Sequence, residues 1–366
     1  MGTTSYGTND ALAVKLWGRT LDVEALKYSD IAALMGKSPG SIIQVKSEFR
    51  KGPGDRLTFG LRMQLNGEGF SENDLAEGNG EELTTYSDAL SINELGNVVG
   101  VKSQYTIDQQ RVPFNLRVEA KDGLRDWYAK RFSVEFFNQV CGITTQTNIK
   151  YTGLNPTVAA TRILRQNGKS DDASLTTGDE FALNMIDNAK ELATTATPPL
   201  RPVNVPGFTN GRRDFNKTLT DKFVVYLHPY QVTDIRTNTS TGQWLDLEKA
   251  ASQGRGHGNR IYDGSIGEYN SCIMRSSYDV PLGVSNAGAN VATARRGVLL
   301  GGQAAVMGFG REGGDVERFR WNEEMFDHKR RLEVSAWTIH GLKKTSFNSL
   351  DYGTVVLSSY AAAHTS

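Results

Sequence analysis

One long amphipathic stretch, residues 111–141, constrains the fold of this chain more than any other. Its apolar residues recur every four positions, at Ala120, Leu124, Tyr128, Phe132, Phe136 and Val140, with Trp127, Val134 and Phe137 beside them. That spacing is typical of a helix with one buried face. Pro113 fits the first position of such a helix, and Gly142 fits its end. We therefore predict a helix over residues 113–141, roughly 40 Å long, whose aromatic stripe needs a large surface laid along it.

The same stretch carries a second, basic row formed by Arg117, Lys121 and Arg125. Residues four apart lie on one face of a helix, so the three charges share a face. The simplest interpretation is a solvated helix surface. The alternatives are a contact with an acidic partner segment and a contact with nucleic acid phosphates.

Residues 41–105 change to a period of two, which is typical of strands. We predict strands at residues 56–63 and 83–92. Together they form a long two-stranded ribbon. The tip of the ribbon is acidic, with Glu77, Glu81 and Glu82 following other carboxylates and no lysine or arginine among them. Because an isolated two-stranded ribbon is marginal in water, this one needs a receiving surface on its own subunit or on another.

The rest of the chain alternates helical and strand patterns. We expect a helix through residues 181–192, capped by Thr177 or Asp179, and another at 230–236. Strand patterns lie at residues 223–227, 272–276, 298–309, 331–341 and 352–360. Residues 308–313 match G-x-G-x-x-G, but an alternating stretch follows instead of a helix. A glycine-rich hairpin is the better interpretation than a dinucleotide site.

The composition of the chain argues against several classes of protein. The chain has 366 residues with 41 basic and 41 acidic side chains, which argues against a dedicated nucleic-acid-binding module. Its two cysteines, Cys141 and Cys272, form no C-x-x-C pair, and its five histidines lack ligand spacing, so no metal, cofactor or disulfide framework is expected. Carboxylates are plentiful, but the sequence alone pairs none of them into an acid and a base. The most apolar run, residues 297–310, is too short to cross a membrane.

Several stretches resemble one family. They are residues 4–11, 51–59, 75–79, 110–114, 227–232, 241–244 and 341–345. Together with the order of arm, ribbon, long helix and late strands, they resemble a tailed-phage major capsid protein of the Hong Kong 97 fold. The branch is that of N-four-like podophages, short-tailed coliphages with very large virion RNA polymerases. The resemblance spans nearly the whole chain.

The resemblance implies an α+β fold and a division of the chain. It implies an N-terminal arm at residues 1–40, an extended ribbon loop and the start of the peripheral domain at 41–110, and a spine helix and peripheral domain at 111–178. An axial domain would follow at 179–310, and strands at 311–366 would complete the peripheral domain. In such a fold the extended loop crosses a neighbouring subunit. We therefore expect Glu77, Glu81 and Glu82 of one subunit to meet Arg117, Lys121 and Arg125 of the next.

The implied function is self-assembly into hexamers, pentamers and an icosahedral shell around double-stranded DNA, in a virion assembled in the bacterial host cytoplasm. Expected partners are a separate scaffolding protein, because the chain has no room for a long scaffolding segment, as well as a portal, decoration proteins and DNA contacted non-specifically. An encapsulin-like nanocompartment of the same fold is the nearest alternative. An oxidoreductase that uses the glycine motif is the alternative from another class.

Overall fold

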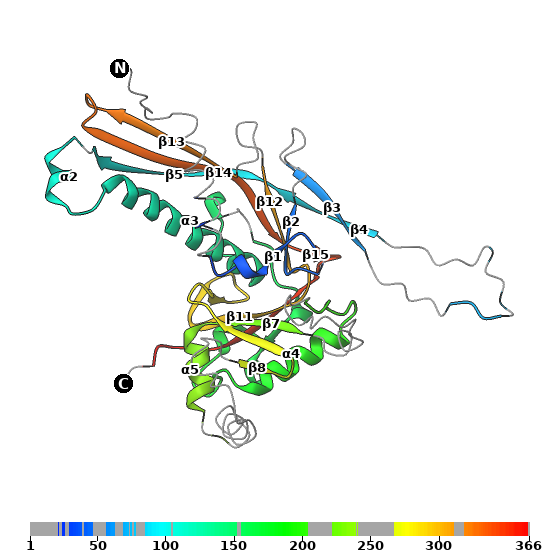
Figure 1. Ribbon diagram of the computed structural model, residues 1–366. Helices are drawn as coiled ribbons and strands as arrows, with labels where there is room; N and C mark the ends of the chain where they lie inside the picture. Colours follow the sequence, from blue (N-terminus) through cyan, green and yellow to red (C-terminus); the bar gives the residue numbers. More distant parts are fainter. Residues whose placement is uncertain are drawn as a thin grey trace, which may run out of the picture.

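The computed structural model describes residues 21, 24–25, 29–38, 40–46, 56–62, 69–72, 74, 77, 85–103, 105–151, 155–203, 222–238, 240, 267–310 and 318–364. These residues build two sheets with a long helix, α3 (Leu116–Val140), alongside the first of them. Figure 1 shows α3 running parallel to the long strands at the top of the molecule, with the second sheet and its helices below.

The first sheet has six strands in the order β1-β2-β12-β14-β13, with β5 on the other edge of β14. Its strands are β1 (Met35–Gly36), β2 (Ile43–Lys46), β5 (Asn93–Lys102), β12 (Ala305–Phe309), β13 (Phe319–Phe326) and β14 (Arg331–Lys344). β14 is the centre of this sheet, because β5, β12 and β13 all pair with it in antiparallel register. Helix α2 (Ile107–Arg111) joins β5 to the start of α3.

The second sheet has seven strands in the order β6-β17-β11-β7-β9-β8, with β10 beside β11. They are β6 (Ile163–Arg165), β7 (Phe223–Leu227), β8 (Gly267–Tyr269), β9 (Cys272–Ser276), β10 (Leu282–Val284), β11 (Asn290–Leu300) and β17 (Thr354–Tyr360). Helices α4 (Leu183–Thr195) and α5 (Pro229–Thr237) pack on it, and every residue of β7 is buried. Such fully apolar strands are typical of a sheet covered on both faces.

Two small two-stranded sheets and several single turns complete the described fold. The two-stranded ribbon consists of β3 (Arg56–Arg62) and β4 (Thr85–Ser91), which pair in antiparallel register. β15 (Ser346–Phe347) and β16 (Leu350–Asp351) form a small hairpin before β17. Single 3₁₀ turns lie at Ala32–Leu34, Ile149–Tyr151, Ala160–Arg162, Gln166–Gly168 and Asp172–Ser174.

The predicted stripe on the long helix is confirmed. Ala120, Leu124, Tyr128, Phe132, Phe136 and Val140 are all buried, in the larger of the two main cores. Phe132 lies against the rings of Tyr128, Phe309, Phe319 and His340. The Tyr128 hydroxyl donates to the carbonyl oxygen of Ala336 at 2.7 Å, so the helix is also bonded to β14.

The helix ends as predicted but begins later. Gly142 has a φ of 64°, and the N–H groups of Gly142 and Ile143 donate to the carbonyls of Gln139 and Asn138, the arrangement of a Schellman cap. The predicted start at Pro113 is wrong. Asn115 caps the helix by accepting from the Arg117 N–H at 3.0 Å, so Pro113 lies outside it.

Three other expectations need correction. Neither Thr177 nor Asp179 caps α4, whose N-cap is Ala182 without a side-chain bond; the Asp179 carboxylate instead accepts from the N–H of Thr176. The predicted strand over residues 298–309 is two strands in different sheets, β11 and β12. The glycine motif is no hairpin turn, because β12 and β13 both pair with the same side of β14, Phe309 opposite His340 and Phe319 opposite Thr338. β12 and β13 therefore do not pair with each other, and residues 311–317 between them lie outside the described part of the chain.

The strands of each sheet come from distant parts of the chain. β17 lies in the second sheet, beside β11, whereas β13 and β14, which precede it, lie in the first. β12 directly follows β11 in sequence but lies in the first sheet. The division of the chain into an arm, a peripheral domain and an axial domain stays a prediction.

Replacement of Phe132 by alanine should destabilise the subunit by about 3–5 kcal/mol, because the ring is fully buried among aromatic neighbours and its loss leaves a cavity. Denaturant unfolding of the isolated subunit measures this. Val118→Ala on the same helix is the control, since Val118 is 41% exposed and should change stability by about 0.5 kcal/mol or less. Equal losses in the two variants would contradict the assigned role of the stripe.

Candidate assembly surfaces

The ribbon is fixed at its root and exposed at its tip. At the root, Phe59 and Leu90 are buried against Val306 of β12. Asp88 forms an ion pair with Lys343 and accepts from the N–H of Ser346 at 3.2 Å. Only Ile92 separates β4 from β5, so the ribbon continues directly from the first sheet. In Figure 1 it projects from the sheet on the side away from α2.

The described tip residues, Gly69–Glu72, Asp74 and Glu77, are all exposed. Phe70 is 50% exposed, and hydrogen bonds from the hydroxyl and N–H of Ser71 lower the pKa of Asp74, which favours its charged form. Glu81 and Glu82 lie outside the described residues. The tip therefore presents carboxylates and one aromatic ring to whatever lies beyond the subunit.

The basic row already has partners within the subunit. Arg117 pairs with Glu323 of β13 at 2.8 Å. Lys121 and Arg125 approach the carboxylate of Glu24 at 3.1 and 3.9 Å. The side chain of Arg117 is 39% exposed, whereas those of Lys121 and Arg125 are 13% and 18% exposed. Neither Glu24 nor Glu323 was anticipated from the sequence, where nothing relates them to the helix.

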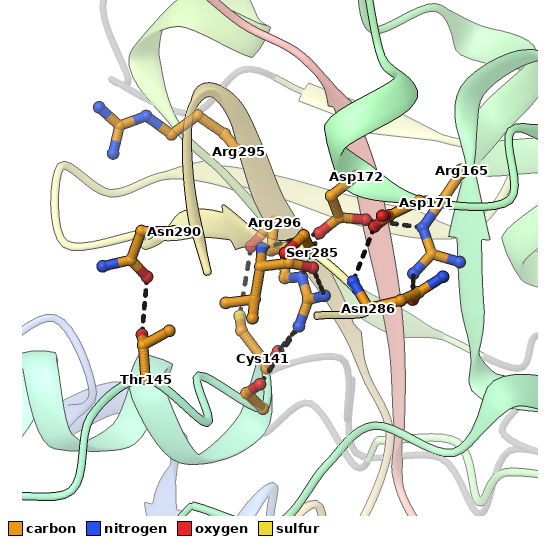
Figure 2. Close-up of polar contacts among 12 residues, drawn as sticks. Cys141, Thr145, Arg165, Asp171, Asp172, Ser285, Asn286, Asn290, Arg295 and Arg296 are labelled. Atoms are coloured by element: carbon orange, nitrogen blue, oxygen red, sulfur yellow. Dashed lines mark hydrogen bonds and ion pairs between the residues drawn. The ribbon is translucent and has the colours of Figure 1, made fainter. Parts of the chain in front are cut away.

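A buried ionic junction ties the end of α3 to the second sheet (Figure 2). Arg296 of β11 donates from Nε to Asp172 at 2.7 Å, from Nη1 to the carbonyls of Cys141 and Gly142, and from Nη2 to the carbonyl of Val284. Asp172 also accepts from Arg165 Nε at 2.7 Å. The last carbonyls of a helix have no intrahelical donors, so Arg296 satisfies them while its charge is neutralised by Asp172.

Burial alone would raise the pKa of Asp172, but Arg296 and the hydrogen bond from Arg165 outweigh it and hold that pKa below its usual value. Asp172 is completely buried and Arg296 is 5% exposed. Asp172 lies in a polar, irregular stretch of the sequence, and the adjacent Asp171 offers the same chemistry. No local pattern therefore identified this junction in advance.

A buried ion pair and a buried hydrogen bond connect β14 to neighbouring elements. Lys344 Nζ contacts Asp351 at 2.7 Å, and both side chains are almost fully buried. His340 Nε2 lies 2.8 Å from Glu135 Oε2 of α3, again with both groups buried. These contacts fix the relative positions of α3, β14 and the hairpin before the C-terminal strand.

The described residues show little sign of other chemistry. Among them, no group of three or more histidine, cysteine or carboxylate side chains is arranged to hold a metal ion. None of the helices in this part of the chain has the length and apolar character needed to cross a bilayer. Cys141 and Cys272 are free and buried, and burial raises their pKa values to about 12 and about 11.

Comparison with solved structures places this architecture among phage capsids. A capsid of Ralstonia phage GP4 is similar over 100% of this chain and 96% of that one, with 26% identity and a TM-score of 0.74. The capsid of cyanophage Pam1 is similar over 93% of this chain and 94% of its own, with 20% identity and a TM-score of 0.69. The head structure of Helicobacter pylori bacteriophage KHP40 covers 91% of each chain with 16% identity and a TM-score of 0.59. No curated protein sequence matches.

At neutral pH, Asp172→Asn should destabilise the subunit by about 3–5 kcal/mol, because it leaves the buried charge of Arg296 without its counter-ion. The folded pKa of Asp172 lies below 3.8, so its contribution is fully present above that value and is lost as the pH falls through the folded pKa. The stability gap between wild type and variant should therefore narrow in acid. Urea unfolding at neutral and acidic pH measures it.

Asp171→Asn is the matched control for that experiment. Asp171 is only partly buried and accepts one backbone hydrogen bond, from Asn286. Its replacement should cost about 1 kcal/mol. If the stability difference between wild type and Asp172→Asn stayed constant with pH, the charge of the carboxylate would contribute nothing to the stability of the subunit.

The fold is the Hong Kong 97 fold of tailed-phage capsids, as the resemblance implied, and the mixture of helices and sheets confirms the α+β class. The particular branch of podophages stays a prediction. The family model described as phage capsid protein matches residues 3–363. The chain therefore belongs to the phage capsid protein family and is a structural protein that forms the capsid shell of a virion.

Proposed function

We propose that copies of this chain assemble into hexamers and pentamers that close an icosahedral shell around double-stranded DNA. The observation that carries this proposal is the ribbon: its root is packed and ion-paired to the first sheet, while its described tip is exposed. A two-stranded ribbon of this kind is marginal without an outside surface. A neighbouring copy in a closed shell supplies that surface at every position.

The proposal assigns a role to each part of the chain. Residues 1–40 act as the arm, the ribbon as the extended loop, and α3 with the first sheet as the peripheral domain. The second sheet, including β17, acts as the axial domain at the centre of the capsomer. The match to the phage capsid family favours a viral shell over the encapsulin-like nanocompartment, and a purely structural role over an enzymatic one.

The remaining partners belong to the same proposal. A separate scaffolding protein guides assembly in the bacterial host cytoplasm, a portal occupies one vertex, and decoration proteins add to the outer surface. Packaged DNA is contacted without sequence specificity. The neutral net charge of the chain suits this arrangement, because copies that pack side by side carry no overall repulsion.

We keep the proposal that the acidic tip of one subunit meets the basic row of the next. Opposite charge supports it: Glu77 is exposed, and Arg117 retains substantial exposure beside Glu323. Exposed ion pairs contribute about 0–1 kcal/mol each. Their role is therefore to set the register of the ribbon and to speed docking, while packing supplies most of the interface energy.

Deletion of residues 66–80 should leave a folded subunit but prevent stable shells, because the segment lies beyond the packed root of the ribbon. Thermal unfolding of the subunit should shift by no more than about 0.5 kcal/mol of stability, while sedimentation and electron microscopy should show no closed particles. A variant with a Gly/Ser segment of equal length is the control for loop length. Wild-type particle yield from the deletion would show that the tip is dispensable.

The charge contact is best tested from the ribbon side. Reversal of Arg117, Lys121 or Arg125 would also disturb Glu323 or Glu24 within the subunit. The combined change Glu77→Lys, Glu81→Lys and Glu82→Lys should slow shell assembly several-fold at low salt while the subunit stays folded, since each lost pair is worth about 0–1 kcal/mol. Time-resolved light scattering measures the rate.

Glu191→Lys, on an exposed position of α4, is the control for a simple change in surface charge. It should leave the assembly rate unchanged. Added salt should bring the wild-type rate down toward that of the triple variant, because salt screens exposed charges. An unchanged rate for the triple variant would remove the acidic tip from the interface.

A further inference from the structure

Two successive arginines on β11 differ completely in their surroundings. Arg296 is buried and donates to Asp172 and to three backbone carbonyls. Arg295 precedes it on the strand, so its side chain leaves the opposite face of the sheet. Figure 2 shows the guanidinium of Arg295 pointing away from the buried junction. The contrast matters because the two residues are chemically identical, and only one of them has a carboxylate partner within the described part of the chain.

Arg295 is half-buried, and no carboxylate of the described residues forms an ion pair with it. The atom Nε is shielded from solvent and has no hydrogen-bond partner among the described residues. Burial lowers the pKa of the guanidinium, and the groups that oppose this shift are Tyr230 and Tyr278, not a carboxylate. The guanidinium lies 5.7 Å from the centre of the Tyr230 ring. A cation–π contact of this kind offsets only part of the cost of removing a charge from water.

Aromatic side chains frame this cation. The ring of His228 lies 4.5 Å from that of Tyr230 and 5.9 Å from that of Tyr278. His228 Nδ1 accepts from the N–H of Tyr230, and burial together with Arg295 lowers the pKa of His228 to about 4, so this ring is neutral near pH 7. Tyr278 is 76% exposed. We call His228, Tyr230, Tyr278 and Arg295 the Arg295 site.

We propose that the Arg295 site receives a carboxylate side chain from a second copy of this chain in the assembled shell. Arginine and tyrosine are the residue types most enriched where interfaces gain their energy. A guanidinium binds a carboxylate through two parallel hydrogen bonds, and shielding by neighbouring rings strengthens such a pair. The inference rests on the shell-forming function, which surrounds every subunit with copies that carry 41 acidic side chains each.

A carboxylate fits the site better than the phosphates of packaged DNA. Binding to nucleic acid backbones is usually built from several lysines and arginines that follow successive phosphates, whereas this site holds one cation in an aromatic frame. Its geometry suits a single acidic side chain.

Arg295→Met is the principal test, because methionine keeps much of the apolar stem and removes the charge. The melting temperature of the unassembled full-length subunit should stay the same or rise, since the variant loses an unmatched, half-buried cation. Shell assembly should weaken about tenfold or more, the loss expected for a hydrogen bond to a charged group. Arg295→Lys should recover part of the assembly, because it restores the charge without the two-pronged geometry.

Arg236→Met is the matched control, because Arg236 is an exposed arginine in the last turn of α5 and outside the aromatic frame. It should assemble as the wild type does. Wild-type protein that forms no particles would contradict the proposed shell function itself. If wild type assembles and Arg295→Met assembles equally well, only the inference about the Arg295 site fails.

Replacement of Tyr278 by photoreactive p-benzoylphenylalanine identifies the occupant in assembled particles. A cross-link to an aspartate- or glutamate-containing peptide of a second copy supports the proposal. Three results would overturn it: a cross-link only within the chain or to a different protein, a fall in the subunit melting temperature of Arg295→Met, or normal empty shells that fail only in DNA retention. The last result would assign the site to phosphate.

Discussion

The packing of α3 against β14 is the contact on which the other parts of this subunit depend. One face of the helix contributes a continuous buried stripe, and β14 pairs with β5 on one edge and with β12 and β13 on the other. Burial of large aromatic side chains is the main source of stability in such a layer. The ribbon and α2 both extend from β5, so their positions depend on this layer.

The buried polar pairs determine how the elements are arranged, whereas the apolar stripe supplies most of the stability. The Arg296–Asp172 junction, the Lys344–Asp351 pair and the His340–Glu135 pair link elements that belong to different layers. Buried ion pairs add little net stability compared with apolar residues of similar size, but the loss of one partner is costly. They therefore select one relative arrangement of helix and sheets, which suits a subunit whose neighbours must all find the same surface.

Charges nearer the surface contribute less to the arrangement of the subunit than the buried pairs do. The cations of the basic row are shared among nearby carboxylates at modest exposure, so their contribution is small and sensitive to salt. Arg295 is the exception, because its cost of burial is not repaid within the described part of the subunit. In the proposed assembly, weak and repeated contacts between exposed charges would allow errors in a growing shell to be corrected, whereas a carboxylate bound to Arg295 would select one docking geometry.

The sequence by itself determined the long helix, its buried face, its glycine end and the ribbon strands, because these depend on local periodicity and on backbone preferences of nearby residues. It also carried the resemblance that implied the shell. Only the tertiary structure decided that β12 joins the first sheet and β17 the second, that Glu24 and Glu323 partner the basic row, and that Asp172 rather than Asp171 neutralises Arg296. These outcomes depend on which distant segments meet, and neither periodicity nor local charge pattern encodes a pairing between residues that lie far apart in the sequence.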